Sequence, residues 1–325
     1  RVHEGLDNEL FLKSVRHLFE DRLGWLRYSG DKALVEGFAR NGYPVELARQ
    51  RIAVGCHWMA LPGREYTLND CVKINTARVF ETAFWETMAR PAAERTVEEL
   101  WRRFETHLER AVAVVAQGLD FHLAHQKDNS PELMLNLLCY GPIEKGVDVT
   151  DRGVEMYNMC VDGSALATVA DSFAAIEQRI EREGRLTWDE LAAQLRADFA
   201  GVEGERVRLM LAGGERYGQP RSLGEKWALR LSRRFTEVVK AGPTPGGRTM
   251  IPGWFSWSNT ISMGKVVGAT PNGRHAKAPI SHGANPDPGF ARDSAPTLMA
   301  QAIAKIQPGY GNTAPIQLEL DPGVA

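Results

Sequence analysis

The sequence predicts an α/β fold with parallel strands, and three observations lead to it. Several long segments repeat apolar residues at helical spacing. Short apolar runs that end in glycine lie between them, as buried strands that lead into loops do. Because parallel strands need long crossovers, strands separated by long helices favour a parallel sheet. The 325 residues, 43% of them hydrophobic and 25% charged, are typical of a folded globular protein.

Most of the chain is predicted to be helical. The expected helices cover residues 6–24, 31–40, 45–51, 72–87, 96–125 and 162–183, and another begins at Thr187. The longest places Leu108, Val112 and Leu119 on one stripe, which indicates a helix that packs on one face. Thr187 and Glu190 have the spacing of a capping box, in which each side chain satisfies a backbone N–H of the first turn.

The strands are expected to be short. Residues 52–56 are an apolar run that reaches a glycine, and we expect a buried strand that runs into the loop at 62–66. A loop rich in glycine and proline, residues 241–247, separates the helical part from the tail. In that tail, residues 265–268 are expected to form a strand and residues 270–274 a tight turn.

Composition and charge exclude several classes of protein. The net charge is −2, from 39 Lys and Arg against 41 Asp and Glu, which gives no electrostatic reason to bind nucleic acid or an anionic membrane. No apolar run reaches about 18 residues, so no membrane span is predicted. The four cysteines have no CxxC spacing, which indicates reduced thiols and a cytoplasmic protein. The chain lacks an initiator Met and a signal-peptide pattern, so it is expected to be an internal segment.

Cys56 is the sharpest candidate for chemistry. It follows Gly55 at the end of an expected strand and precedes an irregular loop, where scaffolds hold reactive groups. The alternative is a small buried thiol with a packing role. The adjacent His57 does not favour a Cys–His dyad, because neighbouring side chains of an extended chain point in opposite directions. His122 and His125 lie three residues apart without a zinc-site pattern, so no metal site is predicted.

Several sequence blocks together resemble a known family. The blocks are residues 52–56, residues 144–150 with Tyr157 and Asn158, and residues 166–176, 264–274, 295–297 and 318–322. The block 264–274 contains the pattern Gly-Ala-Thr-Pro-x-Gly-Arg. The blocks stand in the order of the family and span nearly the whole chain. In these features the sequence resembles the glycyl radical enzymes of the pyruvate formate-lyase-like family.

The resemblance implies a fold, a chemistry and a partner. Residues 1–325 would be an incomplete, helix-rich segment of a ten-stranded α/β barrel, without the N-terminal part and without the C-terminal domain that carries the radical glycine. Cys56 matches the cysteine that becomes a thiyl radical. No cofactor is expected to be bound, because the radical is stored on a glycine outside this chain. A radical S-adenosylmethionine activating enzyme would be the partner, and a homodimer is expected.

One position departs from the family pattern. Several dehydratase, amine-lyase and decarboxylase members have Glu two residues after the cysteine, and here that residue is Trp58. An indole cannot relay protons as a carboxylate does, so elimination of water or an amine is put in doubt. His57, Trp58 and Met59 are the expected pocket wall for an apolar or aromatic substrate. Arg64 is expected to pair with a substrate carboxylate, and its alternative is a surface ion pair.

Three functions remain open at this point. The first is anaerobic carbon–carbon cleavage or decarboxylation of an apolar or aromatic carboxylate by a glycyl radical lyase. The second is radical addition of a hydrocarbon to fumarate, as in the alkyl- and benzylsuccinate synthases. The third, from a different class, is an inert barrel relative that serves as a binding or scaffold subunit. None of the three involves nucleic acid or a membrane.

Overall fold

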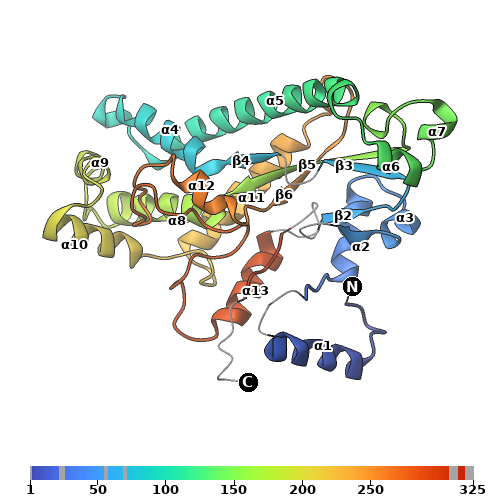
Figure 1. Ribbon diagram of the computed structural model, residues 1–325. Helices are drawn as coiled ribbons and strands as arrows, with labels where there is room; N and C mark the ends of the chain where they lie inside the picture. Colours follow the sequence, from blue (N-terminus) through green and yellow to red (C-terminus); the bar gives the residue numbers. More distant parts are fainter. Residues whose placement is uncertain (1, 22–25, 55–57, 69–71, 307–313, 319–325) are drawn as a thin grey trace.

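The centre of the fold is a parallel sheet of four strands. The computed structural model describes residues 2–21, 26–54, 58–68, 72–306 and 314–318. The long central strand is β5 (Met156–Ser164). β3 (Glu65–Leu68) and β4 (Lys73–Asn75) pair with successive parts of one edge of β5, and β6 (Met250–Trp254) pairs with the other edge. All three pairings are parallel, which confirms the predicted α/β arrangement (Figure 1).

Helices make up most of the rest of the described chain. They are α1 (Asn8–Asp21), α2 (Asp31–Arg40), α3 (Val45–Arg49), α4 (Thr76–Met88), α5 (Val97–Asn129), α6 (Leu133–Leu138), α7 (Pro142–Lys145), α8 (Leu166–Ile176), α9 (Trp188–Arg196), α10 (Gly201–Ala212), α11 (Leu223–Val239), α12 (Asn259–Gly264) and α13 (Ala295–Ile306). A π-helical turn, Glu177–Arg182, extends α8. The predicted capping box at Thr187 and Glu190 is confirmed at the start of α9. Among the described residues, no helix combines the length and the apolar character that a membrane crossing needs.

The two faces of the sheet differ in what covers them. Side chains alternate between the faces of a strand. One set faces the main hydrophobic core, which the helices α4, α5, α8 and α11 supply; we call this side the outer face. Its sheet residues are Tyr66, Leu68, Ile74, Met159, Val161, Met250 and Trp254. The opposite set forms the inner face, which the hairpin of β1 (Ile52–Val54) and β2 (Trp58–Ala60) covers.

Three of the predicted elements are wrong in detail. Residues 52–54 do form a strand, but it is exposed and antiparallel to β2, because β1 has no second neighbour among the described strands. Residues 162–164 belong to β5 and not to a helix, and β6 was not predicted. Residues 265–268 form no strand, because the Arg274 guanidinium binds the carbonyl oxygens of Val267 and Gly268, which a ladder would need.

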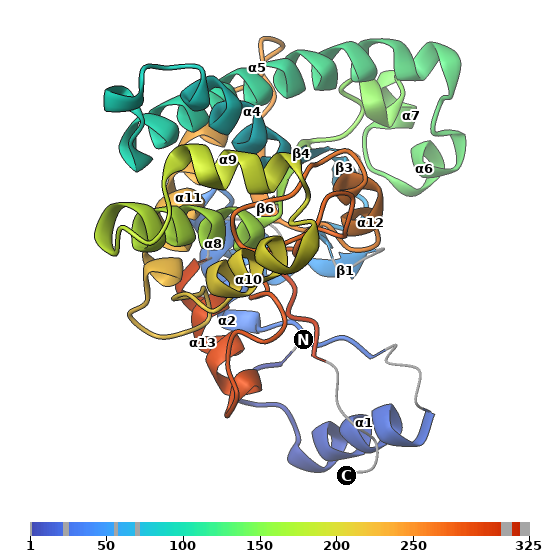
Figure 2. The ribbon, with the colours of Figure 1, turned by 90° about the vertical axis from the view of Figure 1, so that its left-hand side faces the viewer.

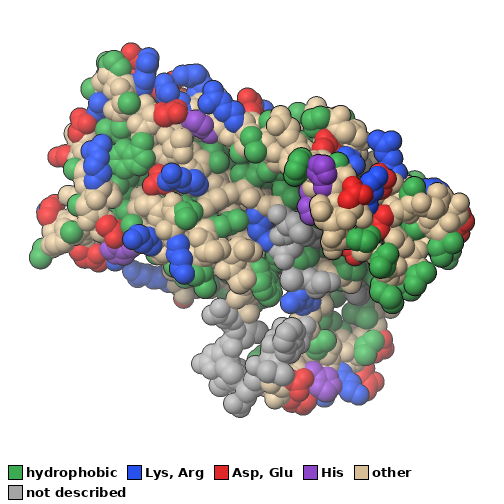
Figure 3. Space-filling view, turned by 45° about the horizontal axis from the view of Figure 1, so that its top comes forward, with side chains coloured by type: hydrophobic (Ala, Val, Ile, Leu, Met, Phe, Trp, Pro, Cys, Tyr) green, Lys and Arg blue, Asp and Glu red, His purple; other side chains and the backbone are tan. Residues whose placement is uncertain are grey.

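Two regions lie outside the main core. In both ribbon views α1 stands apart from the sheet, and none of its residues is buried (Figures 1 and 2). The segment of α6 and α7 exposes large apolar side chains, on the right in Figure 3. They are Leu133, Met134, Leu137, Leu138, Tyr140 and Ile143, each at least 65% exposed. These side chains contribute nothing to the described core, so the stability of the fold rests on the sheet and its helices.

Candidate active site

The inner face of the sheet carries polar side chains that are buried. Asn158, Cys160 and Asp162 alternate along β5, and none of the three is exposed to solvent. Glu65 on β3 lies on the same face and is also buried. Polar and ionisable groups are rarely buried in a core unless they are paired or have a function. The inner face therefore holds the candidate site, at the side that the β1–β2 hairpin covers.

The two strands on either side of the predicted cysteine loop form the hairpin that covers this face. β1 and β2 pair in the register Ile52 with Ala60 and Val54 with Trp58. Only residues 55–57 connect the last pair. Cys56 and His57 lie outside the described residues, so their predicted roles stay predictions. The strand that follows them is packed in the interior, since Trp58 and Met59 of β2 are both at most 2% exposed.

A buried ion pair anchors the base of the hairpin. Arg51 directly precedes β1, and its two terminal nitrogens donate to the Glu65 carboxylate at 2.7 and 2.8 Å. Its guanidinium also donates to the Met59 carbonyl and lies over the rings of Phe38 and Tyr43, at 3.7 and 4.2 Å from their centroids. Both charged side chains are almost completely buried. Bidentate geometry with ring contacts on the guanidinium holds the hairpin against β3.

Trp58 begins an array of rings at the carboxyl ends of the strands. Its ring centroid lies 4.5 Å from that of Phe255, edge to face, and both residues pack on Cys160. Phe255 contacts Trp257 and His282 in turn, with centroids 5.8 and 6.3 Å apart. The Trp58 indole N–H is buried and has no hydrogen-bond partner in the described structure. Two residues after Cys56 in sequence, Trp58 therefore contributes an aromatic ring and an N–H donor that is unpartnered among the described residues.

The other two predicted pocket residues have different surroundings. Met59 packs with Phe38, Ala48 and Ile251, in a small cluster beside the ring array. Arg64 lies just before β3, is about two fifths exposed, and binds Glu155 at 2.6 Å. That contact is the surface ion pair that the sequence left open as the alternative. The geometry brings Trp58 and Met59 together at the inner face, and it leaves Arg64 at the surface.

Several residues of this face were not predicted as site residues, although Asn158 stood in one of the blocks that carry the family resemblance. Both amide atoms of Asn158 are buried without a partner in the described part of the chain. The Cys160 thiol donates to an Asp162 carboxylate oxygen at 3.2 Å. Both ring nitrogens of His282 are likewise buried and unpartnered. The polar residues at every second position of 158–162 were the signal that would have found the first three, once β5 is recognised as a strand.

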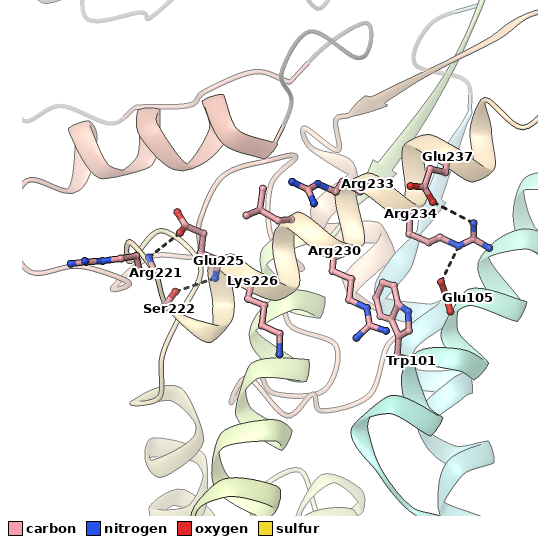
Figure 4. Close-up of a pocket in the computed structure, with 11 residues that line it drawn as sticks. Trp101, Glu105, Arg221, Ser222, Glu225, Lys226, Arg230, Arg233, Arg234 and Glu237 are labelled. Carbon is pink, nitrogen blue, oxygen red and sulfur yellow. Dashed lines mark hydrogen bonds and ion pairs between the residues drawn. The ribbon is translucent and has the colours of Figure 1, made fainter.

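A hollow lies away from the inner face and has different chemistry. It is a surface groove of about 670 Å³ between α5 and α11 (Figure 4). Its charged side chains are mostly paired: Arg230 binds Glu98 at 2.7 Å, and Arg234 binds Glu105 at 3.0 Å. α11 turns its opposite side, with Trp227 and Leu231, to the core. The groove is thus separated from the inner face by a helix layer and the sheet.

Metal chemistry has no described centre in this chain. Within the described ranges, no three His, Cys, Asp or Glu side chains come together as a metal ion would require. His122 and His125 lie on the exposed surface of α5.

Comparison with known proteins identifies the family. The sequence model described as "Pyruvate formate lyase-like" matches residues 1–264. The chain belongs to the pyruvate formate lyase-like family. This confirms the resemblance carried by the sequence blocks. Solved structures agree: a glycyl radical enzyme from Archaeoglobus fulgidus superposes with a TM-score of 0.83 at 20% identity, over 96% of this chain and 41% of that one.

Two curated relatives and a further solved structure are similar over two fifths to nearly all of this chain. The (2S)-3-sulfopropanediol dehydratase of Klebsiella oxytoca is 22% identical over 321 residues, which cover 94% of this chain and 39% of the relative. An isethionate sulfite-lyase of Bilophila wadsworthia is 31% identical over 134 residues, 41% of this chain and 16% of the relative. The glycerol-bound B12-independent glycerol dehydratase of Clostridium butyricum superposes with a TM-score of 0.86 at 21% identity, over 96% of this chain and 41% of that chain.

These matches confirm the expected fold class, an α/β segment of the glycyl radical enzyme barrel. Where nearly the whole of this chain matches a relative, the match covers only about two fifths of that relative's length.

Proposed function

We propose that this chain is the cysteine-bearing part of a glycyl radical lyase, in which Cys56 forms the thiyl radical that attacks the substrate. The observation that carries the proposal is the anchored β1–β2 hairpin, whose three-residue tip contains Cys56 and which covers the polar inner face. Dehydratases and sulfite-lyases among the relatives support a lyase-type reaction. Buried polar atoms without partners on that face cost stability, and an inert scaffold would gain nothing that offsets this cost.

The proposed hydrogen-atom transfers require only a thiol, a stored radical and a substrate C–H bond. The Cys56 thiol gives one hydrogen atom to the glycyl radical, which becomes glycine, and the sulfur keeps the unpaired electron. The thiyl sulfur then takes one hydrogen atom from a substrate C–H bond, and the substrate radical fragments. The product radical takes the hydrogen atom back from the thiol, which leaves the thiyl radical again. The thiyl sulfur then takes a hydrogen atom from the glycine, so the cysteine thiol and the stored glycyl radical are both restored. A dry, closed surrounding protects these radicals, and the buried Trp58 and Phe255 rings would supply it.

The substrate that suits this site is an apolar or aromatic carboxylate. Trp58 stands two residues after Cys56 and packs edge to face on Phe255, so the wall beside the thiol is aromatic and holds no carboxylate at that position. This composition favours carbon–carbon cleavage or decarboxylation over elimination of water. Addition of a hydrocarbon to fumarate remains the second candidate, because the same aromatic wall suits a hydrocarbon.

The proposed enzyme needs partners beyond this chain. The stored radical requires a radical S-adenosylmethionine activating enzyme, and the glycine that holds it lies outside residues 1–325 in this proposal. We also propose a cytoplasmic location, since radical chemistry requires a reduced thiol. A homodimer is proposed from the resemblance to the family. Size-exclusion chromatography with light scattering on the full-length protein tests the dimer directly.

Replacement of Cys56 tests the proposed function. In the anaerobically activated full-length enzyme, we expect Cys56→Ala to abolish turnover, because methyl cannot exchange a hydrogen atom, while the glycyl radical signal in electron paramagnetic resonance persists. Cys139→Ala is the matched control, since that thiol lies between α6 and α7 and away from the inner face. Carbon dioxide released from arylacetates supports the lyase, and a substituted succinate formed from toluene and fumarate supports the synthase. Turnover retained in Cys56→Ala contradicts both.

A further inference from the structure

His282 is held in place by its neighbours while its own ring is left without a partner. The Ser281 N–H donates to the Thr168 hydroxyl at 2.9 Å, and the Ser281 hydroxyl accepts from the Thr168 N–H in the first turn of α8 at 3.1 Å. On the other side, the Gly283 N–H donates to the Ser256 hydroxyl at 2.7 Å. The backbone on both sides of His282 is thus fixed to the ends of α8 and β6.

The tight fit of Gly283 strengthens this argument. Its φ is +47°, and a side-chain carbon there would approach the Trp254 carbonyl oxygen to 2.9 Å. A side chain at this position would therefore collide with β6, so the backbone of Gly283 lies close against the end of that strand. A rigid backbone that presents an unsatisfied side chain is the arrangement expected of a ligand-binding residue.

The unsatisfied atoms of His282 are both ring nitrogens. They are buried and have no hydrogen-bond partner in the part of the chain that the structure describes. The polar groups of the adjacent Ser281, and of Ser256 which bonds to this segment, all have hydrogen-bond partners. Because burial without a partner costs free energy, one orphaned side chain in a satisfied loop indicates a missing ligand.

The surroundings of His282 define the chemistry of that ligand. Its ring lies 5.7 Å from the Trp257 ring and 6.3 Å from the Phe255 ring, so the body of the ligand meets aromatic faces. Two cations lie over those rings: Arg27 over Trp257 at 5.0 Å and Lys73 over Phe255 at 5.5 Å. Burial lowers the pKa of His282, so the neutral ring offers one N–H donor at pH 7. A donor among cations and aromatic rings suits an aromatic anion.

We propose that His282 binds the carboxylate of the substrate through a ring N–H, with Phe255 and Trp257 against its apolar body. This inference rests on the proposed function, for which it names the group that recognises the acid end of the substrate. It makes His282 a specificity-determining residue and leaves the radical step to Cys56.

Binding to the unactivated full-length protein tests this inference without radical chemistry. The probes are phenylacetate, and toluene as the same ring without a carboxylate, each followed by tryptophan fluorescence and calorimetry. We expect His282→Ala to weaken phenylacetate binding at least about tenfold, the range for a hydrogen bond to a charged group. Toluene binding should change less than about twofold, and His282→Gln, which keeps a donor, should restore most of the loss. His275→Ala is the matched control, because that ring is exposed and paired with Asp198.

The outcomes separate this inference from the proposed function. Equal losses for phenylacetate and toluene would show that His282 only shapes the pocket, and no loss at all would show that it does not touch the ligand. Absence of phenylacetate binding to the wild-type protein would also overturn the inference. In each of these cases the effect of Cys56→Ala on turnover still decides the radical mechanism. Cys56→Ala itself should bind phenylacetate as the wild type does.

Discussion

The two faces of the central sheet follow opposite rules. On the outer face, Met159, Val161 and Trp254 are apolar and pack against helices. On the inner face, the residues of β5 that alternate with Met159 and Val161 are Asn158, Cys160 and Asp162. These three residues are buried just as completely. Neighbouring residues of one strand thus meet two environments that differ in polarity and not in exposure.

The difference indicates that the two faces serve different purposes. The outer face gains free energy by removing apolar surface from water. The inner face contributes less to the free energy of folding, because unpartnered polar atoms such as those of the Asn158 amide are unfavourable in a dry interior. Proteins keep such groups mainly where function needs them. Substitutions on the two faces should therefore separate stability from activity.

The largest effect is expected at the Arg51–Glu65 pair, a buried structural contact on the inner face. Arg51→Met would leave the Glu65 carboxylate buried and unpaired, because both side chains are at most 1% exposed. We expect a loss of about 3–5 kcal/mol, the usual cost of breaking a buried ion pair. Denaturant unfolding of the full-length protein, followed by tryptophan fluorescence, measures it.

Two further variants sharpen that result. Arg64→Met breaks the exposed pair with Glu155 near the same hairpin and should cost no more than about 1 kcal/mol. The double variant Arg51→Met with Glu65→Leu should recover part of the single loss, since no uncompensated charge remains. If Arg51→Met and Arg64→Met cost the same, the pair does not anchor the hairpin.

The fold was largely predictable because its signals are local. Apolar periodicity found α2 and α5, and the capping pattern found the start of α9. The strands were harder: β6 is buried along its whole length and shows no alternation, and β5 runs directly into α8, so its last residues were assigned to the helix expected over 162–183. β1 was expected to be buried, because its apolar residues do not reveal that it lies at the edge of a hairpin.

The site was predictable only where a sequence pattern marks it. Cys56 stands in a glycine-ended run, and Trp58 was noted as its neighbour. Asn158 and His282 come from segments about 100 and 226 residues further along, and only the folded chain shows that their polar atoms lack partners. Arg64 has the charge of a carboxylate-binding residue, but nothing in the sequence reveals that Glu155 is within reach of it.

A smaller loss is expected from Gly163→Ala, which tests the close packing of the outer face. An added methyl carbon would come within 2.6 Å of the Trp254 ring. That ring cannot move easily, because its N–H donates to the Ser232 hydroxyl and its face packs on Phe235. We expect a loss of about 1–3 kcal/mol, measured by the same denaturant unfolding. Gly242→Ala is the control, because a methyl there meets open space, and equal losses would contradict the packing argument.

The smallest effect on stability is expected at Asn158, and it is the most direct test of the comparison. Asn158→Leu puts an apolar side chain of similar size in place of an amide that has no hydrogen-bond partner in the described chain. The free energy of unfolding should therefore stay within about 1 kcal/mol of the wild-type value or rise. Turnover should fall, because the inner face loses a polar group. The reverse change on the same strand, Val161→Asn, buries a new amide in the helix-covered core and should cost at least about 2 kcal/mol. Equal destabilisation by the two variants would show that Asn158 is a structural residue and that the two faces do not differ in purpose.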